Sequence, residues 1–100
     1  MPRVLVTYKV KADRVKENED LVKAVYAELH QINNPEVHYA TFKKEDGQTF
    51  VHINSFATPE IQSVVSGTKA FGAFQKNLKE RCEIPPDVQP LSEVGSYNFV

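Results

Sequence analysis

The sequence has few of the features that mark secreted or membrane proteins. Cys82 is its only cysteine, which excludes an internal disulfide and fits a reducing compartment. No apolar run is long enough to cross a bilayer, and the N-terminus enters a strand pattern without the basic start and apolar core of a signal peptide. We therefore expect a cytoplasmic protein with no membrane partner.

An excess of charge of one sign is also lacking. Twelve basic and 13 acidic residues give a net charge of −1, and no basic run is present, so we expect no nucleic-acid partner. Glycine is scarce, and Gly67 and Gly72 lie in no phosphate-cradling loop. The three histidines, His30, His38 and His52, have no carboxylate at metal-binding spacing, so we expect no metal site.

What is present is the composition of one globular domain covering residues 1–100, with 41% hydrophobic and 25% charged residues. Apolar and polar residues alternate over residues 3–11, which predicts a strand. From Val15 to Ile32 the apolar positions recur at helical spacing, with Asp13 as the expected N-cap. Asn33, Asn34 and Pro35 should end this helix.

Residues 36–44 and 49–56 read as two strands joined at Asp46-Gly47, a strong hairpin signal. A type I′ turn there would place Thr41 opposite His52 and Tyr39 opposite Asn54, whereas a three-residue loop would shift this register.

The second half of the chain predicts two successive helices and a last strand. Thr58 should cap a short helix that ends at Gly67, and Thr68 should open a second helix that continues to just before Pro85 and carries Cys82. We expect Cys82 to serve packing rather than nucleophilic chemistry. The last strand should cover residues 88–99, interrupted by Pro90 and Gly95, which suggest a sheet edge or a bulge.

The order of elements predicts an α+β, ferredoxin-like β-α-β-β-α-β fold, a four-stranded antiparallel sheet with helices on one face. The other sheet face would still carry apolar side chains and needs a cover. In so short a chain a second copy is the simplest cover, so we expect a homodimer in which two sheets meet face to face.

The strand at residues 49–56 has no plainly solvated face, which is typical of a strand covered on both sides. Phe50, His52, Asn54 and Phe56 share one face by alternation. Two polar side chains among aromatic ones indicate the wall of a pocket.

This pattern resembles the dimeric α/β-barrel superfamily and, within it, the antibiotic-biosynthesis-monooxygenase family, over nearly the whole chain. The resemblance is carried by Val-Thr-Tyr-Lys-Val-Lys at 6–11, Asn-Pro-Glu-Val-His-Tyr at 34–39, Phe-Val-His-Ile-Asn-Ser-Phe-Ala at 50–57 and Ala-Phe-Gly-Ala-Phe at 70–74. It implies a dimer with one pocket per subunit between sheet and helices. Some members oxidise phenols or quinols with dioxygen and without metal or flavin, and others degrade haem.

By position, the resemblance matches Tyr39 to a tyrosine common on the second strand and His52 to a polar pocket residue of some monooxygenases. Phe56 stands where many members have tryptophan. Asn54 stands where members commonly have an acidic residue. In the haem-degrading branch the ligating histidine falls where this chain has Gln75, which weighs against haem.

Two hypotheses follow for function. In the first, the chain is a cofactor-independent monooxygenase that acts on a small aromatic, phenolic or quinol-like molecule. His52 takes a phenolic proton, Asn54 and Tyr39 hold the oxygen atoms, and the pocket is completed by Tyr8, Phe56 and Phe74.

In the second, the chain is a non-catalytic small-ligand binder or dimeric scaffold. His52 is then a sheet histidine bonded to Thr41 or to backbone, Asn54 is a satisfied polar residue beside Tyr39, and Phe74 belongs to the core.

Overall fold

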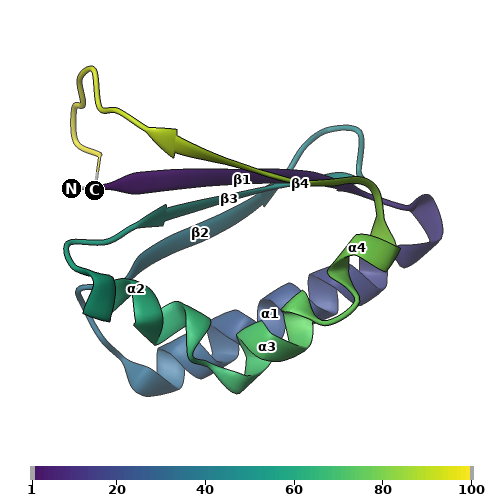
Figure 1. Cartoon of the computed structure of the whole chain (residues 1–100), viewed down its shortest axis with the longest axis horizontal. Helices are drawn as coiled ribbons and strands as arrows, with labels where there is room; N and C mark the ends of the chain where they lie inside the picture. Colours follow the sequence, from purple (N-terminus) through teal and green to yellow (C-terminus); the bar gives the residue numbers. More distant parts are fainter. Residues whose placement is uncertain (1, 100) are drawn as a thin grey trace.

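The chain folds as one sheet covered on one face by helices (Figure 1). The computed structural model describes residues 2–99. The strands pair antiparallel in the order β2-β3-β1-β4, which confirms the predicted α+β, ferredoxin-like plan. In chain order the elements are β1 (Arg3–Val10), a 3-10 turn η1 (Ala12–Arg14), α1 (Val15–Ile32), β2 (His38–Lys43), β3 (Thr49–Ser55), α2 (Pro59–Ser66), α3 (Lys69–Gln75), α4 (Leu78–Arg81) and β4 (Cys82–Leu91).

Helix α1 has the predicted extent but not the predicted N-cap. Asp13 lies inside the 3-10 turn, which the Arg14 N–H closes by donating to the Lys11 carbonyl at 2.9 Å. Its backbone therefore turns where a capping residue would be extended, and no side chain caps α1. The helix ends before Asn33, as the Asn33-Asn34-Pro35 sequence predicts. Asn33 itself adopts a left-handed conformation with φ of 55°.

The register of the β2–β3 hairpin is the predicted one. Thr41 lies opposite His52, and Tyr39 lies opposite Asn54. These four side chains therefore share the sheet face that the helices cover.

The turn that sets this register differs from the prediction. Of the two expected turn residues only Gly47 has a positive φ, 74°, whereas a type I′ turn needs a positive φ at both. The loop instead closes through the Lys44 N–H, which donates to the Thr49 carbonyl, and the Gly47 N–H, which donates to the Lys44 carbonyl. The Asp46 carboxylate accepts from the backbone N–H groups of Gln48 and Thr49 at 2.9 and 2.8 Å. Four loop residues rather than two give the same strand pairing.

The single helix predicted from Thr68 to Pro85 is wrong, because the chain breaks between α3 and α4. Lys76 is extended and Asn77 is left-handed with φ of 62°, a conformation that asparagine tolerates better than most residues. Cys82 is buried, as expected, but it opens strand β4 instead of lying in a helix.

The last strand is also displaced from its prediction, since β4 covers Cys82–Leu91 and residues 92–99 form no helix or strand. Pro85 and Pro86 form a bulge opposite Tyr8. They are accommodated because β4 is an edge strand, where a missing N–H removes no bond to a further strand. Pro90 lies at a sheet edge, as predicted, but it pairs with Val4 in regular register and does not interrupt the strand, and Gly95 lies beyond the end of β4.

The core lies between the sheet and the helices. Even-numbered residues of β1 and β3 point into it, and odd-numbered ones point to the outer face. Tyr8, Phe50 and Phe74 are almost fully buried there. Among residues 2–99 no helix has the length and apolar character needed to cross a bilayer.

Candidate functional site

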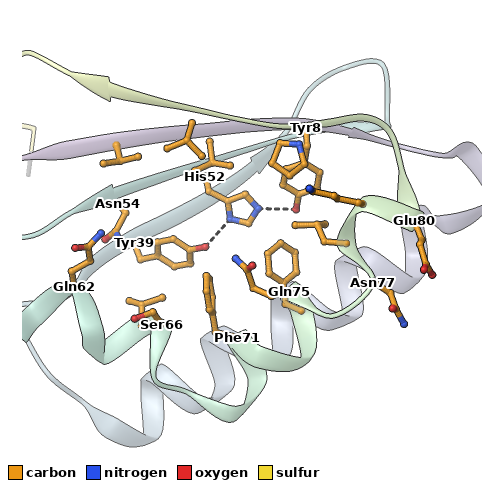
Figure 2. A pocket seen from close by; sticks show the side chains of 18 residues that line it. Tyr8, Tyr39, His52, Asn54, Gln62, Ser66, Phe71, Gln75, Asn77 and Glu80 are labelled. Atoms are coloured by element: carbon orange, nitrogen blue, oxygen red, sulfur yellow. Dashed lines mark hydrogen bonds between the residues drawn. The ribbon is translucent and has the colours of Figure 1, made fainter.

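A cavity of about 650 Å³ lies between the inner sheet face and helices α2, α3 and α4. This volume is typical of a site for a small organic molecule. Figure 2 shows the side chains of β2 and β3 directed towards those of the helices across it. The sheet supplies most of the polar groups at its centre.

The walls are mainly apolar. Aromatic side chains come from both layers, Tyr8 and Tyr39 from the sheet and Phe71 and Phe74 from α3. Aliphatic side chains complete the surface, namely Val4, Val6, Val65, Leu78 and Val88. Such walls suit a flat aromatic molecule.

Four amide side chains line the cavity at separate places: Asn54, Gln62, Gln75 and Asn77. In Figure 2, Asn54 and Gln62 lie near one end and Asn77 near the other, beside Glu80. Each amide offers both a donor and an acceptor, so hydroxyl and carbonyl groups can be bound along the edge of a ligand.

His52 lies at the centre of the site, only 4% exposed. Its Nε2 is hydrogen-bonded to the Tyr8 hydroxyl at 2.8 Å. Its Nδ1 lies 2.9 Å from both the Tyr39 hydroxyl and the Thr41 hydroxyl. The imidazole also stacks between the Tyr8 and Tyr39 rings, with centroid distances of 5.3 and 5.7 Å. Both ring nitrogens are thus occupied by protein hydroxyls.

Burial keeps the central groups neutral. It lowers the pKa of His52 to about 4 from an ordinary value of 6.5. It raises the pKa of the Tyr8 and Tyr39 phenols well above their usual range. At neutral pH the centre of the pocket therefore holds an uncharged imidazole between two uncharged phenols.

Behind Tyr8 lies a pair of buried polar residues that the sequence analysis missed. Asn18 Nδ2 donates to the Tyr8 hydroxyl at 3.0 Å, and Arg81 Nε donates to Asn18 Oδ1 at 3.2 Å. Asn18 is fully buried, and Arg81 is 1% exposed. A signal for Asn18 was present, because it stands three residues after Val15 and four before Val22, on the apolar stripe of α1.

Most of the predicted site residues come together. Tyr8, Tyr39, His52, Asn54 and Phe74 all line the one cavity. Thr41 bonds His52, as the non-catalytic reading of the histidine expected.

Phe56 is not among the residues that line the cavity. It follows Ser55, the last residue of β3, so the strand alternation that would place it beside Asn54 has ended. Its N–H instead donates to the Pro2 carbonyl at 3.1 Å.

Gln75, at the position where the haem-degrading branch has its histidine, lines the cavity. Within residues 2–99, no three His, Cys, Asp or Glu side chains gather in a group that could hold a metal ion. Cys82 lies outside the cavity lining, and burial raises the pKa of its thiol. Its position fits the packing role expected of it.

Comparison with known proteins shows which fold this chain shares. No protein-family model matches the chain, and no curated protein matches it. Solved structures do match. A structure described as an antibiotic biosynthesis monooxygenase aligns with a TM-score of 0.77 at 15% identity, over 95% of this chain and 100% of that one.

Two further structures give the same result. Rv0793 from Mycobacterium tuberculosis aligns with a TM-score of 0.75 at 14% identity, over 95% and 96% of the two chains. SnoaB from Streptomyces nogalater, described as a cofactor-independent oxygenase, aligns with a TM-score of 0.70 at 10% identity, over 98% and 97%. At such identities the likeness is one of fold, and it confirms the fold that the sequence resemblance implied.

Proposed function

We propose that this chain, which shares the fold of antibiotic biosynthesis monooxygenases, is a cofactor-independent monooxygenase acting on a small phenolic or quinol-like molecule. The observation that carries the proposal is the arrangement of His52, Tyr39 and Asn54 inside a mainly apolar cavity of about 650 Å³. Hydroxyl and amide groups in an aromatic-walled site suit a flat ring with oxygen atoms on its edge. Lys79 and Glu80 are the charged residues of the lining.

The reaction balances without a further reductant. A phenol and dioxygen give a quinone and water: one oxygen atom enters the ring, the other leaves as water, and the substrate supplies all the electrons. The anion of the phenol is the electron-rich form that reacts with oxygen. Groups that stabilise this anion would therefore accelerate the reaction.

In this proposal the Tyr39 hydroxyl and the Asn54 amide hold the substrate oxygen atoms. The rings of Phe71 and Phe74 pack on the substrate. His52 has both nitrogens bonded and a lowered pKa, so its geometry favours a role in orienting Tyr39 over direct removal of a proton. The sequence-based hypothesis, in contrast, was that His52 is the base that takes the phenolic proton.

The second candidate is a non-catalytic small-ligand binder, and the hydrogen bonds already made by both His52 nitrogens favour it. A histidine whose two nitrogens already bond Tyr8 and Tyr39 offers no free basic atom to a ligand. The pocket would then bind a small aromatic molecule without changing it.

Oxygen uptake with a panel of quinols separates the two candidates. Parent protein should consume oxygen, and Tyr39→Phe and Asn54→Ala should each lower the rate about 100- to 1000-fold, the range seen when one transition-state donor is lost. His52→Ala should also lower it, whereas His30→Ala, at an exposed histidine in the last turn of α1, should not. Quinol binding with equal or absent uptake in every variant would favour the binder.

We also infer that the functional unit is a homodimer formed through the outer sheet face. Phe42 and Ile84 are 57% and 56% exposed on that face. Leu5, Val51 and Ile53 lie between them and are only half-buried. At roughly 25 cal/mol per Å², covering several hundred Å² of such surface contributes on the order of ten kcal/mol before the cost of association.

A further inference from the structure

A chain of buried side-chain hydrogen bonds runs from α4 to the pocket. Arg81 Nε bonds Asn18 Oδ1 at 3.2 Å, and Asn18 Nδ2 bonds the Tyr8 hydroxyl at 3.0 Å. Tyr8 bonds His52 Nε2 at 2.8 Å, and His52 Nδ1 lies 2.9 Å from the Tyr39 hydroxyl. Figure 2 shows the pocket end of this chain, from Tyr8 through His52 to Tyr39.

The donor and acceptor in each of these hydrogen bonds can be assigned by starting from Arg81. A guanidinium only donates, so the atom of Asn18 that faces Arg81 is the carbonyl oxygen and the atom that faces Tyr8 is the NH₂ group. The Tyr8 oxygen accepts that bond, and its own proton then has His52 Nε2 as its partner. The opposite arrangement would leave the buried Tyr8 proton without an acceptor, which is costly.

This direction decides which nitrogen of His52 carries the proton. Nε2 accepts from Tyr8, so the neutral ring is protonated at Nδ1. Nδ1–H donates towards the Tyr39 and Thr41 hydroxyls, which are equally near. When Tyr39 accepts, its own proton has no other protein partner among residues 2–99 and is available to a ligand in the cavity.

A second observation concerns charge. Arg81 is 1% exposed and donates to Asn18 and to the Phe74 and Lys76 carbonyls, but forms no ion pair with a described residue. The Glu17 carboxylate, whose charge stabilises the Arg81 cation, already forms an ion pair with Arg14 at 2.7 Å. The guanidinium is 5.5 Å from the centroid of the Phe74 ring, which lines the cavity. A buried cation that shares its neighbouring carboxylate with another arginine favours an additional anion nearby.

We propose that Arg81 and Asn18 are positioning residues that fix His52 as the Nδ1–H tautomer, so that the pocket presents donors and binds a phenolic ligand preferentially as its anion. The nature of the ligand rests on the function proposed above. The tautomer does not, since it follows from the hydrogen bonds alone.

The tautomer is measured directly in the parent protein by proton–nitrogen correlation NMR of the His52 ring. We expect a protonated Nδ1 and an unprotonated Nε2. The reverse pattern, or an equal mixture, would overturn the proposal.

Asn18→Asp should reverse the direction of these hydrogen bonds while hardly changing the shape of the side chain. A carboxylate still accepts from Arg81 but also accepts from Tyr8, so the Tyr8 proton turns away from His52 and the ring becomes protonated at Nε2. Gln31→Glu, an amide-to-acid change at an exposed position of the same helix, is the matched control and should keep the parent tautomer. A parent-like tautomer in folded Asn18→Asp would contradict the assignment.

Ligand preference is measured with para-nitrophenol, whose neutral and ionised forms differ in absorbance. Titrations on both sides of the pKa of this ligand should give an anion that binds about tenfold or more tightly than the neutral phenol, the advantage of a charge-assisted over a neutral hydrogen bond. Asn18→Asp should bring the ratio to about one. Equal binding of the two forms by the parent, or no binding, would overturn the anion preference.

If Asn18→Asp does not fold, Asn18→Ala removes the N–H that directs the Tyr8 proton to His52 and leaves a Tyr8 hydroxyl that can either donate or accept. It should lose both the Nδ1–H preference and the anion preference, and retention of both would overturn the proposal. A parent with the expected tautomer and anion preference but no oxygen uptake would reject only the monooxygenase function.

Discussion

The guanidinium of Arg81 lies over the ring of Phe74, 5.5 Å from its centroid, and its Nη2 donates to the Phe74 carbonyl at 2.6 Å. Its Nη1 donates to the Lys76 carbonyl at 3.0 Å. One side chain of α4 therefore satisfies carbonyl groups left at the end of α3 and in the break that follows it.

The first prediction concerns the stability that Arg81 provides. Arg81→Lys keeps the charge but not the planar fork that reaches Asn18 and two carbonyls together, so buried acceptors lose their partners. The free energy of unfolding should fall by about 2–4 kcal/mol, measured by urea denaturation. Arg14→Lys, at an arginine that bonds the exposed Glu17, should change it much less. Equal losses in the two variants would contradict the role given to Arg81.

The second prediction concerns pH and His52. Because burial lowers its pKa from 6.5 to about 4, the unfolded chain binds this proton more readily than the folded one between those values. Its contribution to stability is complete above pH 6.5 and is lost as pH falls towards 4. Between pH 7 and pH 4 the parent should lose about 3 kcal/mol more than His52→Gln, measured by urea denaturation.

Carboxylates also titrate as pH falls, so the difference between parent and variant is the informative quantity. His30→Gln, at an exposed histidine, is the matched control and should follow the parent. If His52→Gln loses as much stability as the parent over this range, His52 is not the buried neutral group that the structure describes.

The third prediction concerns the loop between β2 and β3. The pKa of Asp46 is lowered to about 2 by hydrogen bonds from the Thr49 hydroxyl and from the N–H groups of Gln48 and Thr49. Its stabilisation is present above the ordinary value of 3.8 and is lost as pH falls to about 2. Asp46→Ala should lower the melting temperature at neutral pH, and Glu45→Ala beside it should not. Equal melting temperatures for parent and Asp46→Ala would show that the loop does not need this carboxylate.

The fourth prediction tests the homodimer. Light scattering at micromolar concentration should give a mass of two chains. Ile53→Lys places a charge in the middle of the outer sheet face and should give monomers, because an unpaired lysine is costly in an apolar interface. Ile32→Lys, at an exposed isoleucine at the end of α1, should stay dimeric. A monomeric parent would remove the dimer from the proposal.

The fold was largely predictable because its pattern is local. The alternation of apolar and polar residues predicted the first three strands, and the helical spacing of apolar residues predicted α1. The Asp46-Gly47 signal predicted the pairing of Thr41 with His52, even though the predicted turn type was wrong. The start of β4 was not predictable in this way. Pro85 and Pro86 suggest the end of ordered structure, and only their place at a sheet edge allows a strand to continue through them.

The site was predictable where it follows from strand alternation, as for His52 and Asn54. Arg81 and Asn18 were not found because charged and amide residues on helices are usually solvated. Their burial depends on a contact between residues 63 positions apart. Only the place of Asn18 on the apolar stripe of α1 hinted at its burial, and no local pattern indicated that of Arg81.

Neighbouring residues of β3 lie on opposite faces of the sheet. His52 and Asn54 face the cavity, whereas Val51 and Ile53 face the side proposed to meet a second copy. Substitutions at the cavity-facing positions can therefore change what the protein binds without altering the face proposed to form the dimer. Related chains could therefore diverge widely in what they bind and still pair in the same manner.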